Sequence, residues 1–475
     1  MKILPLDPVA QASPAALRDF LAGCQAAARQ DGHDKLVSIS LAVDALDPLA
    51  VLESIFEPGQ PHFYTERPDL ATAIAGAETA VACEASGPDR FAAVQRWYDD
   101  VLAQTIAVGA VDAPFGGPHA FAGFAFSETT EPGEPFPGAF AFVPRWQVAL
   151  AGTKTTAVAN LLVTREADLD ALAERVWRAH GKFRGFAYAE TPAAETGKAA
   201  SAQFRSAEAG DYRGAVRRAL EYIGAGEFQK IVLARAQDVE ADRPLHPLRM
   251  LNGLRQRFPN CYAFSFARGP GPSFIGASPE RLVRVSKGRL ETEALAGSIR
   301  RGASASEDGA LAAALLRSEK DLREQRQVLD DIVRRLAPLG LAPEFPAAPQ
   351  IRRLANVQHL DTPVTAVLPD GVRVLDVLGA MHPTPAVGGN PRAAAVARIR
   401  ELEGFPRGLY AGALGWLNAR GGGEFFVGIR SALVEGRKAR VYAGAGIVAG
   451  STPDKEFSET ELKFKAMLDA LTGAA

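Results

Sequence analysis

Short apolar runs, each bounded by glycine or proline, alternate along the chain with longer segments in which apolar residues recur at helical spacing. The runs predict β-strands at residues 35–43, 120–126, 139–143, 230–236, 262–266, 281–285, 409–417, 425–433 and 439–443. The helical spacing predicts helices at 169–179, 211–224, 311–336, 392–403 and 454–471. Because groups of strands are interrupted by groups of helices, the pattern favours an α+β fold with antiparallel sheets.

Glycine and proline also indicate how these elements are connected. Three consecutive glycines at 421–423 predict a hairpin, and the proline-rich and glycine-rich residues 127–138 predict a loop. Residues 190–210 are polar and alanine-rich without clear periodicity, which is typical of a linker. We therefore divide the chain into an N-terminal portion, residues 1–200, and a C-terminal portion, residues 205–475, which can share one core.

Two of the predicted helices carry carboxylates on one face. Glu456, Glu459 and Lys463 recur at helical spacing opposite an apolar stripe, and Glu324 and Asp331 lie one heptad apart on the helix near residue 320. Each face is typical of a solvated surface, but each could also bind a hard cation. The spacing leaves both interpretations open, since Mg²⁺ needs only one or two carboxylates in addition to water and substrate oxygens.

Several glycine-rich turns could admit an anion, at 296–298, at 388–391 and at 443–450. Glycines of this kind more often form ordinary turns than ligand cradles. The last segment lacks the strand, turn and helix of a dinucleotide site. The sequence also contains no phosphate-binding GxxxxGK[ST] loop, no GxSxG nucleophile motif and no HExxH zinc motif.

Composition and charge narrow the function classes. The 475 residues are 47% hydrophobic with a formal net charge of -2, so general nucleic-acid binding is not expected and an anionic substrate must be small and bound locally. The 3 cysteines are far apart, which favours reduced thiols over disulfides or a metal cluster. Because we find neither the apolar core of a signal peptide nor an apolar run of the ~20 residues that a membrane span needs, we expect a cytoplasmic protein without a membrane partner.

Taken together, the motifs resemble those of the chorismate-utilising enzymes, a family that includes isochorismate, salicylate, anthranilate and aminodeoxychorismate synthases. The similar segments, in the family's order, are FQKIVLAR from Phe228, IGASPERLV from Ile275, ETEALAGSIRRG from Glu291, SEKDLREQ from Ser318, VQHL from Val357, HPTPAVGGNPR from His382, FPRGLYAGALGW from Phe405, FFVGIRSA from Phe425 and VYAGAGIVAGSTPDKEFSETELK from Val441. The resemblance implies one large α+β domain of two facing antiparallel sheets, with helices packed outside and the substrate in a cleft of the C-terminal portion.

The resemblance also assigns roles to individual residues. Glu324 and Glu459 match the glutamates that hold Mg²⁺, with Glu456 nearby in a less certain role, and the metal would bind the ring carboxylate of chorismate. Arg430 matches the residue that pairs with the enolpyruvyl carboxylate. The remaining expected substrate contacts are Gly297, Ser298, His359, Ala386, Tyr410, Gly444, Gly446 and Lys463.

Lys230 and Glu280 match the pair that carries out the chemistry. Family members that add ammonia to ring carbon 2 carry glutamine where this chain has Lys230, whereas members that add water carry lysine. A buried, neutral lysine can act as general base on that water. Glu280 matches the general acid that protonates the hydroxyl leaving carbon 4, which requires an apolar or anionic setting that keeps the carboxyl neutral.

These matches predict an isochorismate synthase, an isomerase that acts on chorismate with Mg²⁺ as cofactor. Ala386 favours it, because salicylate synthases tend to carry threonine there, and salicylate synthase remains the alternative. A non-catalytic chorismate-binding regulator is disfavoured by the joint presence of Lys230, Glu280, Glu324 and Glu459. We expect no glutaminase subunit and a monomer or weak homodimer, in a pathway to menaquinone, a siderophore or salicylate.

Overall fold

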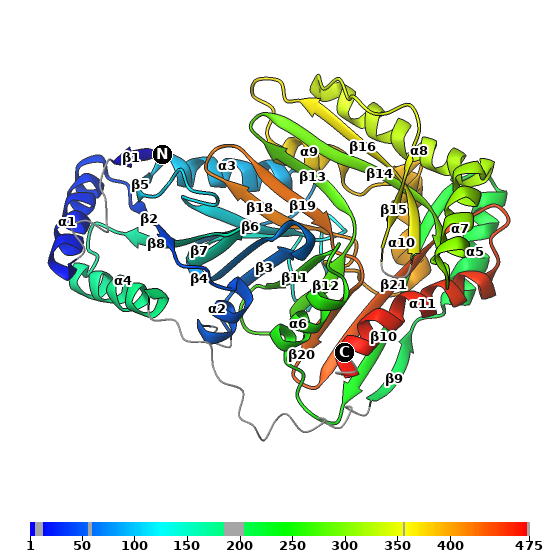
Figure 1. Cartoon of the computed structure of the whole chain (residues 1–475), viewed down its shortest axis with the longest axis horizontal. Helices are drawn as coiled ribbons and strands as arrows, with labels where there is room; N and C mark the ends of the chain where they lie inside the picture. Colours follow the sequence, from blue (N-terminus) through cyan, green and yellow to red (C-terminus); the bar gives the residue numbers. More distant parts are fainter. Residues whose placement is uncertain (5–12, 56–58, 185–203, 355–356, 473–475) are drawn as a thin grey trace.

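The computed structural model describes residues 1–4, 13–55, 59–184, 204–354 and 357–472. Figure 1 shows an elongated molecule with strands through its centre and helices along its outer faces. No helix among these residues is long and apolar enough to cross a membrane.

One long strand, β7 (Ala139–Ala151), joins two arms of sheet. It pairs along its length with β4 (Thr72–Ala85), while its other edge pairs first with β6 (His119–Phe124) and then with β8 (Lys154–Val163). The hydrogen-bonded ladder therefore divides at β7. Every strand pairing is antiparallel except those of β5 (Thr105–Gly109) with β1 (Lys2–Leu4) and with β2 (Lys35–Val43), within the described residues.

The two arms are followed most easily from β7 outwards, and a shorter third branch runs from β8 through β2 and β5 to β1. From β4 the first arm continues through β3 (His62–Arg67), β11 (Tyr262–Ala267), β12 (Ser273–Ser278), β20 (Ser431–Glu435), β21 (Lys438–Val448) and β10 (Lys230–Ala241), which also pairs with β9 (Phe204–Ala209) and β17 (Gly389–Asn390). From β6 the second arm continues through β18 (Ala413–Asn418), β19 (Gly423–Val427), β13 (Arg281–Ser286), β14 (Arg289–Arg300), β16 (Val357–Val367) and β15 (Gln350–Arg353).

Helices cover the outer faces of these arms. At the N-terminal end, α1 (Pro14–Asp31) and α4 (Leu169–Arg184) pack together on β8, and α2 (Pro48–Ile55) packs on β4. On the first arm, α6 (Pro247–Arg257) lies on β11, while α5 (Tyr212–Gly224), α10 (Arg392–Glu403) and α11 (Pro453–Thr472) cover β10 and β21. On the second arm, α9 (Val374–Met381) contacts β13 and α3 (Arg90–Ala103), and α7 (Ala305–Arg317) and α8 (Glu319–Leu336) contact β14.

Phenylalanine rings fill the space between the arms. Phe63 of β3 stacks on Phe121 of β6 with centroids 4.6 Å apart, and Phe264 of β11 lies 5.1 Å from Phe426 of β19. All four side chains are buried in the largest apolar cluster. Rings of this size bury much apolar area and favour offset or edge-on contacts, so they hold the two arms face to face. The α+β fold of two facing sheets with outer helices is confirmed.

Most of the predicted elements are present. The strand at 35–43 and the hairpin at 421–423 are confirmed, and 127–138 contains no helix or strand. The helix predicted at 311–336 is wrong in one respect: it is two helices that meet at Ser318, whose hydroxyl accepts a hydrogen bond from the Asp321 amide. This cap starts a new helix, although the apolar spacing continues across the junction.

Two predicted strands are also shorter than expected. The segment 425–433 is interrupted at Arg430, which adopts a left-handed conformation with φ 50° between β19 and β20. The strand predicted at 409–417 begins only at Ala413, because Leu409 to Gly412 form a turn.

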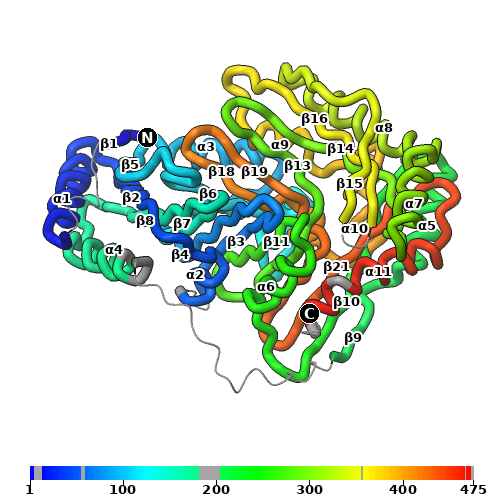
Figure 2. Tube along the Cα trace, viewed as in Figure 1, coloured from blue at the N-terminus to red at the C-terminus, as the bar shows by residue number. Residues whose placement is uncertain are grey.

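The predicted linker falls only in part within the described residues. Residues 190–203 lie outside them, and the rest of the segment is wrong as a linker because β9 pairs with β10 along six residues. The pairings β3 with β11 and β6 with β18 join strands of the N-terminal portion to strands of the C-terminal portion. Figure 2 shows the chain passing between the two portions more than once.

Candidate active site

Lys230 lies at the start of β10 and points toward α8. Its Nζ atom donates to Oε1 of Glu324 at 2.7 Å, and the two side chains are 12% and 34% exposed. β10 places the lysine here because Asn390 and Val448 pair with its backbone from both sides. The structure thus brings together the expected base and one expected metal ligand.

Two glycines of β21 make room for the site. A Cβ atom at Gly446 would lie 3.0 Å from Cε of Lys230, and one at Gly444 would lie 2.7 Å from the Tyr410 hydroxyl. The buried Tyr410 ring stacks on Tyr442 with centroids 4.9 Å apart, which fixes its direction. At Gly444 the close approach of Tyr410 therefore favours glycine, whereas a Cβ atom at Gly446 would displace only the flexible end of Lys230.

The C-terminal helix brings its charged face to the same strand. Lys463 of α11 donates to the Gly444 carbonyl at 2.7 Å and to Oε1 of Glu459 at 2.8 Å. Glu456 lies one helical turn before Glu459. Burial raises the pKa of the Glu456 carboxyl, a hydrogen bond from Ser451 opposes the rise, and the charge of Glu459 adds to it. This face of α11 therefore contacts β21 through Lys463, although the Lys463 and Glu459 side chains are 42% and 51% exposed.

Glu280 occupies the short connection between β12 and β13. Burial raises the pKa of its carboxyl to about 7, the charge of Glu293 adds to the rise, and Lys230 and Arg352 oppose it. Its carboxyl makes no hydrogen bond or ion pair with any residue that the structure describes. A carboxyl with this pKa is partly protonated near neutral pH and can donate a proton.

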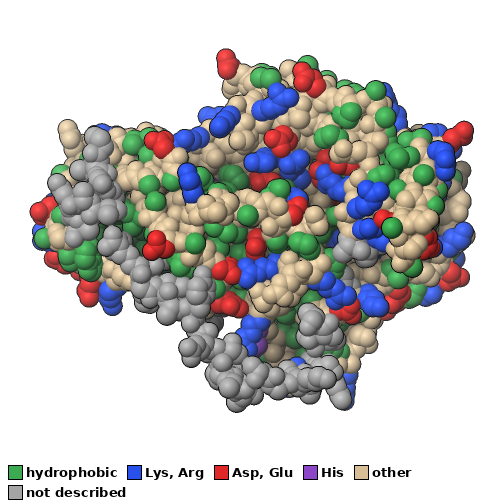
Figure 3. Space-filling model, in the orientation of Figure 1, with side chains coloured by type: hydrophobic (Ala, Val, Ile, Leu, Met, Phe, Trp, Pro, Cys, Tyr) green, Lys and Arg blue, Asp and Glu red, His purple; other side chains and the backbone are tan. Residues whose placement is uncertain are grey.

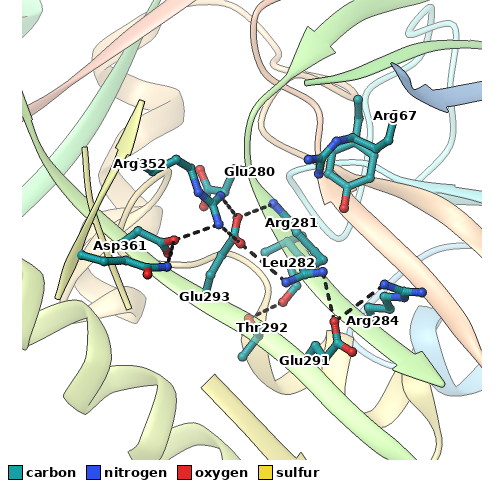
Figure 4. Close-up of polar contacts among 12 residues, drawn as sticks. Arg67, Glu280, Arg281, Leu282, Arg284, Glu291, Thr292, Glu293, Arg352 and Asp361 are labelled. Carbon is teal, nitrogen blue, oxygen red and sulfur yellow. Dashed lines mark hydrogen bonds and ion pairs between the residues drawn. The ribbon is translucent and has the colours of Figure 1, made fainter. Parts of the chain in front are cut away.

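An ion-pair network lies directly beside Glu280 (Figure 4). Glu293 of β14 accepts two hydrogen bonds of 2.6 Å from Arg352 of β15, and Arg352 also lies 3.0 Å from Asp361 of β16. Gln350 donates to the same Asp361 oxygen at 3.2 Å. Arg352 is therefore directed toward two carboxylates by hydrogen bonds, while Glu280 has no cation of its own.

Arg430 sits between β19 and β20 in the left-handed conformation described above. Burial lowers the pKa of its guanidinium, and the thiol of Cys261, which bonds to it, opposes the fall. A non-glycine residue with positive φ carries backbone strain, which often marks a functional position. The strained backbone directs a charged side chain into the interior, where an anion could neutralise it.

Ser298 and His359 face each other across β14 and β16. Ser298 Oγ and His359 Nδ1 are 2.8 Å apart, next to a β-bulge at Gly297, whose φ is 72°. Burial, with the charges of Arg430 and Lys463, lowers the pKa of His359 to about 3, so the ring is neutral. Its buried Nε2 atom has no hydrogen-bond partner among the described residues and is available to a ligand.

Ala386 lies in a turn between α9 and β17. The Val232 amide donates to the Gly388 carbonyl at 2.9 Å, which fastens this turn to β10. Beneath it, the buried side chain of Arg407 donates to the carbonyls of Val387 at 2.8 Å and Val232 at 2.7 Å. The structure gives no direct contact between Ala386 and another expected site residue.

The expected metal ligands are carboxylates, the kind of donor that Mg²⁺ prefers. Glu324, Glu459 and Glu456 come from two helices that approach each other, since Lys320 of α8 acts electrostatically on Glu456 of α11. No three Asp, Glu, His or Cys side chains of the described ranges gather closely enough to hold a metal by themselves. One or two carboxylates are sufficient for Mg²⁺, because water and substrate oxygens supply its other ligands.

Positive and negative side chains are mixed on the face of the molecule that Figure 3 shows. Lys230, Arg430 and Lys463 supply cations to the site, while the glutamates supply carboxylates. The expected site therefore carries charges of both signs, as the whole chain with its net charge of -2 does.

The sequence analysis missed four residues that border the site. Glu293 and Arg352 lie beside Glu280, Cys261 bonds to Arg430, and the buried hydroxyl of Tyr212 has no partner in the described part of the chain although Glu456 and Glu459 act on it. A possible signal was the pair of glutamates that flank Thr292, ahead of the apolar residues 294–296 of the same strand.

Comparison with known proteins identifies the family. A profile of the family described as "Chorismate binding enzyme" matches residues 21–472. This chain belongs to the chorismate-binding enzymes. It is 37% identical over 446 residues to the "Salicylate biosynthesis isochorismate synthase" of Pseudomonas aeruginosa, covering 92% of this chain and 90% of that protein. It is 31% identical over 467 residues to "Isochorismate synthase MenF" of Bacillus subtilis, covering 94% and 95%.

Solved structures of chorismate-binding enzymes have the same fold. The menaquinone-specific isochorismate synthase MenF of Escherichia coli superposes with a TM-score of 0.77 at 26% identity, covering 95% of this chain and 99% of that one. The anthranilate synthase component I of Streptococcus pneumoniae, at 23% identity and a TM-score of 0.67, shares the fold.

Proposed function

We propose that this protein is an isochorismate synthase, which converts chorismate reversibly to isochorismate. The observation that supports this most strongly is that Lys230 and Glu280 lie near enough to interact electrostatically. A lysine stands where ammonia-using members of the family carry glutamine, and the raised pKa of Glu280 keeps part of its carboxyl protonated near neutral pH. The names of the two relatives compared above agree with this function.

The reaction requires one base and one acid. Lys230, acting as general base, takes a proton from water as the water oxygen bonds to ring carbon 2. The ring double bond shifts, the bond between carbon 4 and its hydroxyl oxygen breaks, and Glu280 gives its proton to the departing hydroxyl, which leaves as water. One water enters and one leaves, so the substrate is isomerised; in the reverse reaction the two residues exchange the roles of acid and base.

The other site residues bind and orient the substrate. Arg430 suits the planar enolpyruvyl carboxylate, and Lys463, Tyr410 and the neutral His359 offer donors to the remaining oxygens. Gly297, Ser298, Gly444, Gly446 and Ala386 shape the walls of the site. Magnesium, held by Glu324 and Glu459 with Glu456 nearby, would supply positive charge to the ring carboxylate.

The decisive experiment is product analysis. Purified protein is incubated with chorismate and Mg²⁺, with and without chelator, and the products are separated by chromatography. We expect isochorismate that disappears when the metal is chelated. Salicylate with pyruvate as the main products would establish the alternative synthase, and an aminated product formed from ammonium salts would contradict the assignment based on Lys230.

A further inference from the structure

Glu293 holds the backbone that carries Glu280. Its Oε1 atom accepts a hydrogen bond of 3.2 Å from the backbone amide of Arg281, the residue that directly follows Glu280. The Glu293 side chain is only 3% exposed, and its two bonds to Arg352 fix its orientation. Figure 4 shows the Glu293 carboxylate between Arg352 and Arg281, on the side of the network where Glu280 lies.

The cations near Glu280 form ion pairs with other carboxylates. Glu293 faces it from β14, Arg352 from β15 and Lys230 from β10. Arg352 is bonded to Glu293 and lies beside Asp361, and Lys230 is bonded to Glu324, so both cations are directed to other carboxylates. Two hydrogen bonds from Arg352 stabilise the negative charge of Glu293, which leaves Glu280 as the member of the pair that holds a proton.

We propose that Glu293 is a positioning residue, whose fixed negative charge keeps the Glu280 carboxyl protonated and whose bond to the Arg281 amide orients it. This inference rests on the proposed role of Glu280 as general acid. The charges around Glu280 support this role. After burial, Glu293 contributes most to the raised pKa of Glu280, and Arg352 opposes the rise less strongly.

Glu291 provides a matched control on the same strand. It lies two residues before Glu293, and therefore on the same face of β14. It also contacts Arg281, at 3.2 Å from the guanidinium, and lies 3.7 Å from Arg284. It is not among the groups that act on Glu280. Replacing it therefore disturbs Arg281 without changing the charge that Glu280 experiences.

The test is the pH dependence of kcat/KM for chorismate in the wild type and in Glu293→Gln, Glu293→Asp and Glu291→Gln. Loss of the Glu293 charge lowers the pKa of Glu280 by roughly one pH unit. The ratio of Glu293→Gln to wild type is then near one at about pH 5.5 and falls about tenfold by about pH 8.5. Glu293→Asp, which keeps the charge, and Glu291→Gln give ratios that do not change with pH.

A Glu293→Gln ratio that is constant with pH overturns the proposal, as does an equal fall in Glu291→Gln. If Glu293→Gln does not fold, Glu293→Gln combined with Arg352→Gln removes the buried ion pair as a unit; we expect a fall in the same direction but smaller, and a constant ratio overturns the proposal there too. Glu280→Gln distinguishes failure of the proposed general acid from failure of the proposed positioning residue. Full activity of Glu280→Gln overturns the role of Glu280 itself. An inactive Glu280→Gln together with a Glu293→Gln ratio that is constant with pH overturns only the role of Glu293.

Discussion

Two glutamates of this protein, the buried Glu403 and the partly buried Glu280, are placed in opposite ways. Glu403, beneath β10, accepts hydrogen bonds from Arg407, the closest at 2.5 Å, and one from the Ala234 amide at 2.6 Å. Glu280 has no such partner among the described residues and faces a second carboxylate. Burial raises the pKa of both, but at Glu403 the arginine and the amide oppose the rise.

The difference in ion-pair partners shows that the two carboxyl groups serve different purposes. A carboxylate with its charge and its lone pairs satisfied is a structural element, and here it supports β10 and the turn that carries Ala386. A carboxyl whose charge is left unsatisfied keeps its proton and is available for chemistry. The same residue type therefore serves stability in one place and reactivity in the other.

The largest expected effect is a loss of catalytic activity at Glu280 and Lys230. Glu280→Gln and Lys230→Ala should each lower kcat by about 10²–10⁴-fold, the range typical of general acid and base catalysis. Circular dichroism should show both variants folded, since neither side chain supports the core. A Glu280→Gln variant with wild-type kcat would sink the assignment of the acid.

The second effect concerns stability at the other glutamate. Arg407→Met leaves the Glu403 carboxylate buried without its guanidinium, which should reduce the free energy of unfolding by about 3–5 kcal/mol. Urea denaturation measures it. Arg398→Met is the control, because the pair of Arg398 with Glu227 is roughly one-third exposed and should be worth less than about 1 kcal/mol. Equal losses in both variants would remove the distinction between a buried and a surface pair.

The third effect is a pH dependence of stability at Glu280. Its pKa in the folded protein, about 7, is above the ordinary value of 4.5, so the folded state binds this proton more tightly than the unfolded chain does. The resulting stabilisation is complete below pH 4.5 and is lost as the pH rises through about 7. Glutamine does not titrate, so Glu280→Gln should gain roughly 3 kcal/mol relative to wild type between those limits. Urea unfolding at about pH 5 and about pH 8 measures this gain, and a difference that does not change with pH contradicts it.

The smallest expected effect is the stabilisation by Mg²⁺ through Glu324 and Glu459, which pair with Lys230 and Lys463. Mg²⁺ at about 100 times its Kd should stabilise the protein by about 2.7 kcal/mol, and Glu324→Gln or Glu459→Gln should abolish most of that gain. Thermal unfolding with and without Mg²⁺ measures it. Asp330→Asn is the control on α8, since Asp330 is exposed and pairs with Arg326. If Asp330→Asn loses the gain to the same extent, α8 does not provide a specific ligand.

The sequence alone predicted most of the strands and helices and proposed a set of site residues. The strand at 35–43 is observed with the same bounds, because apolar runs between turns depend only on local chemistry. β14 was missed, since its charged residues Arg289, Glu291 and Glu293 interrupt the apolar pattern. The division of the helix at Ser318 was missed because a local cap overrides a continuing apolar period.

The sequence by itself determined the fold class, the family resemblance and the residue types of the chemistry, since motifs such as FQKIVLAR and SPERL lie on continuous segments. Only the tertiary structure decided which charges neighbour Glu280. Glu293, Arg352 and Lys230 come from three strands that are distant along the chain, and a carboxyl's protonation depends on the charges and burial around it in space. No local pattern contains that information, because charged residues in strands are ordinarily directed to solvent.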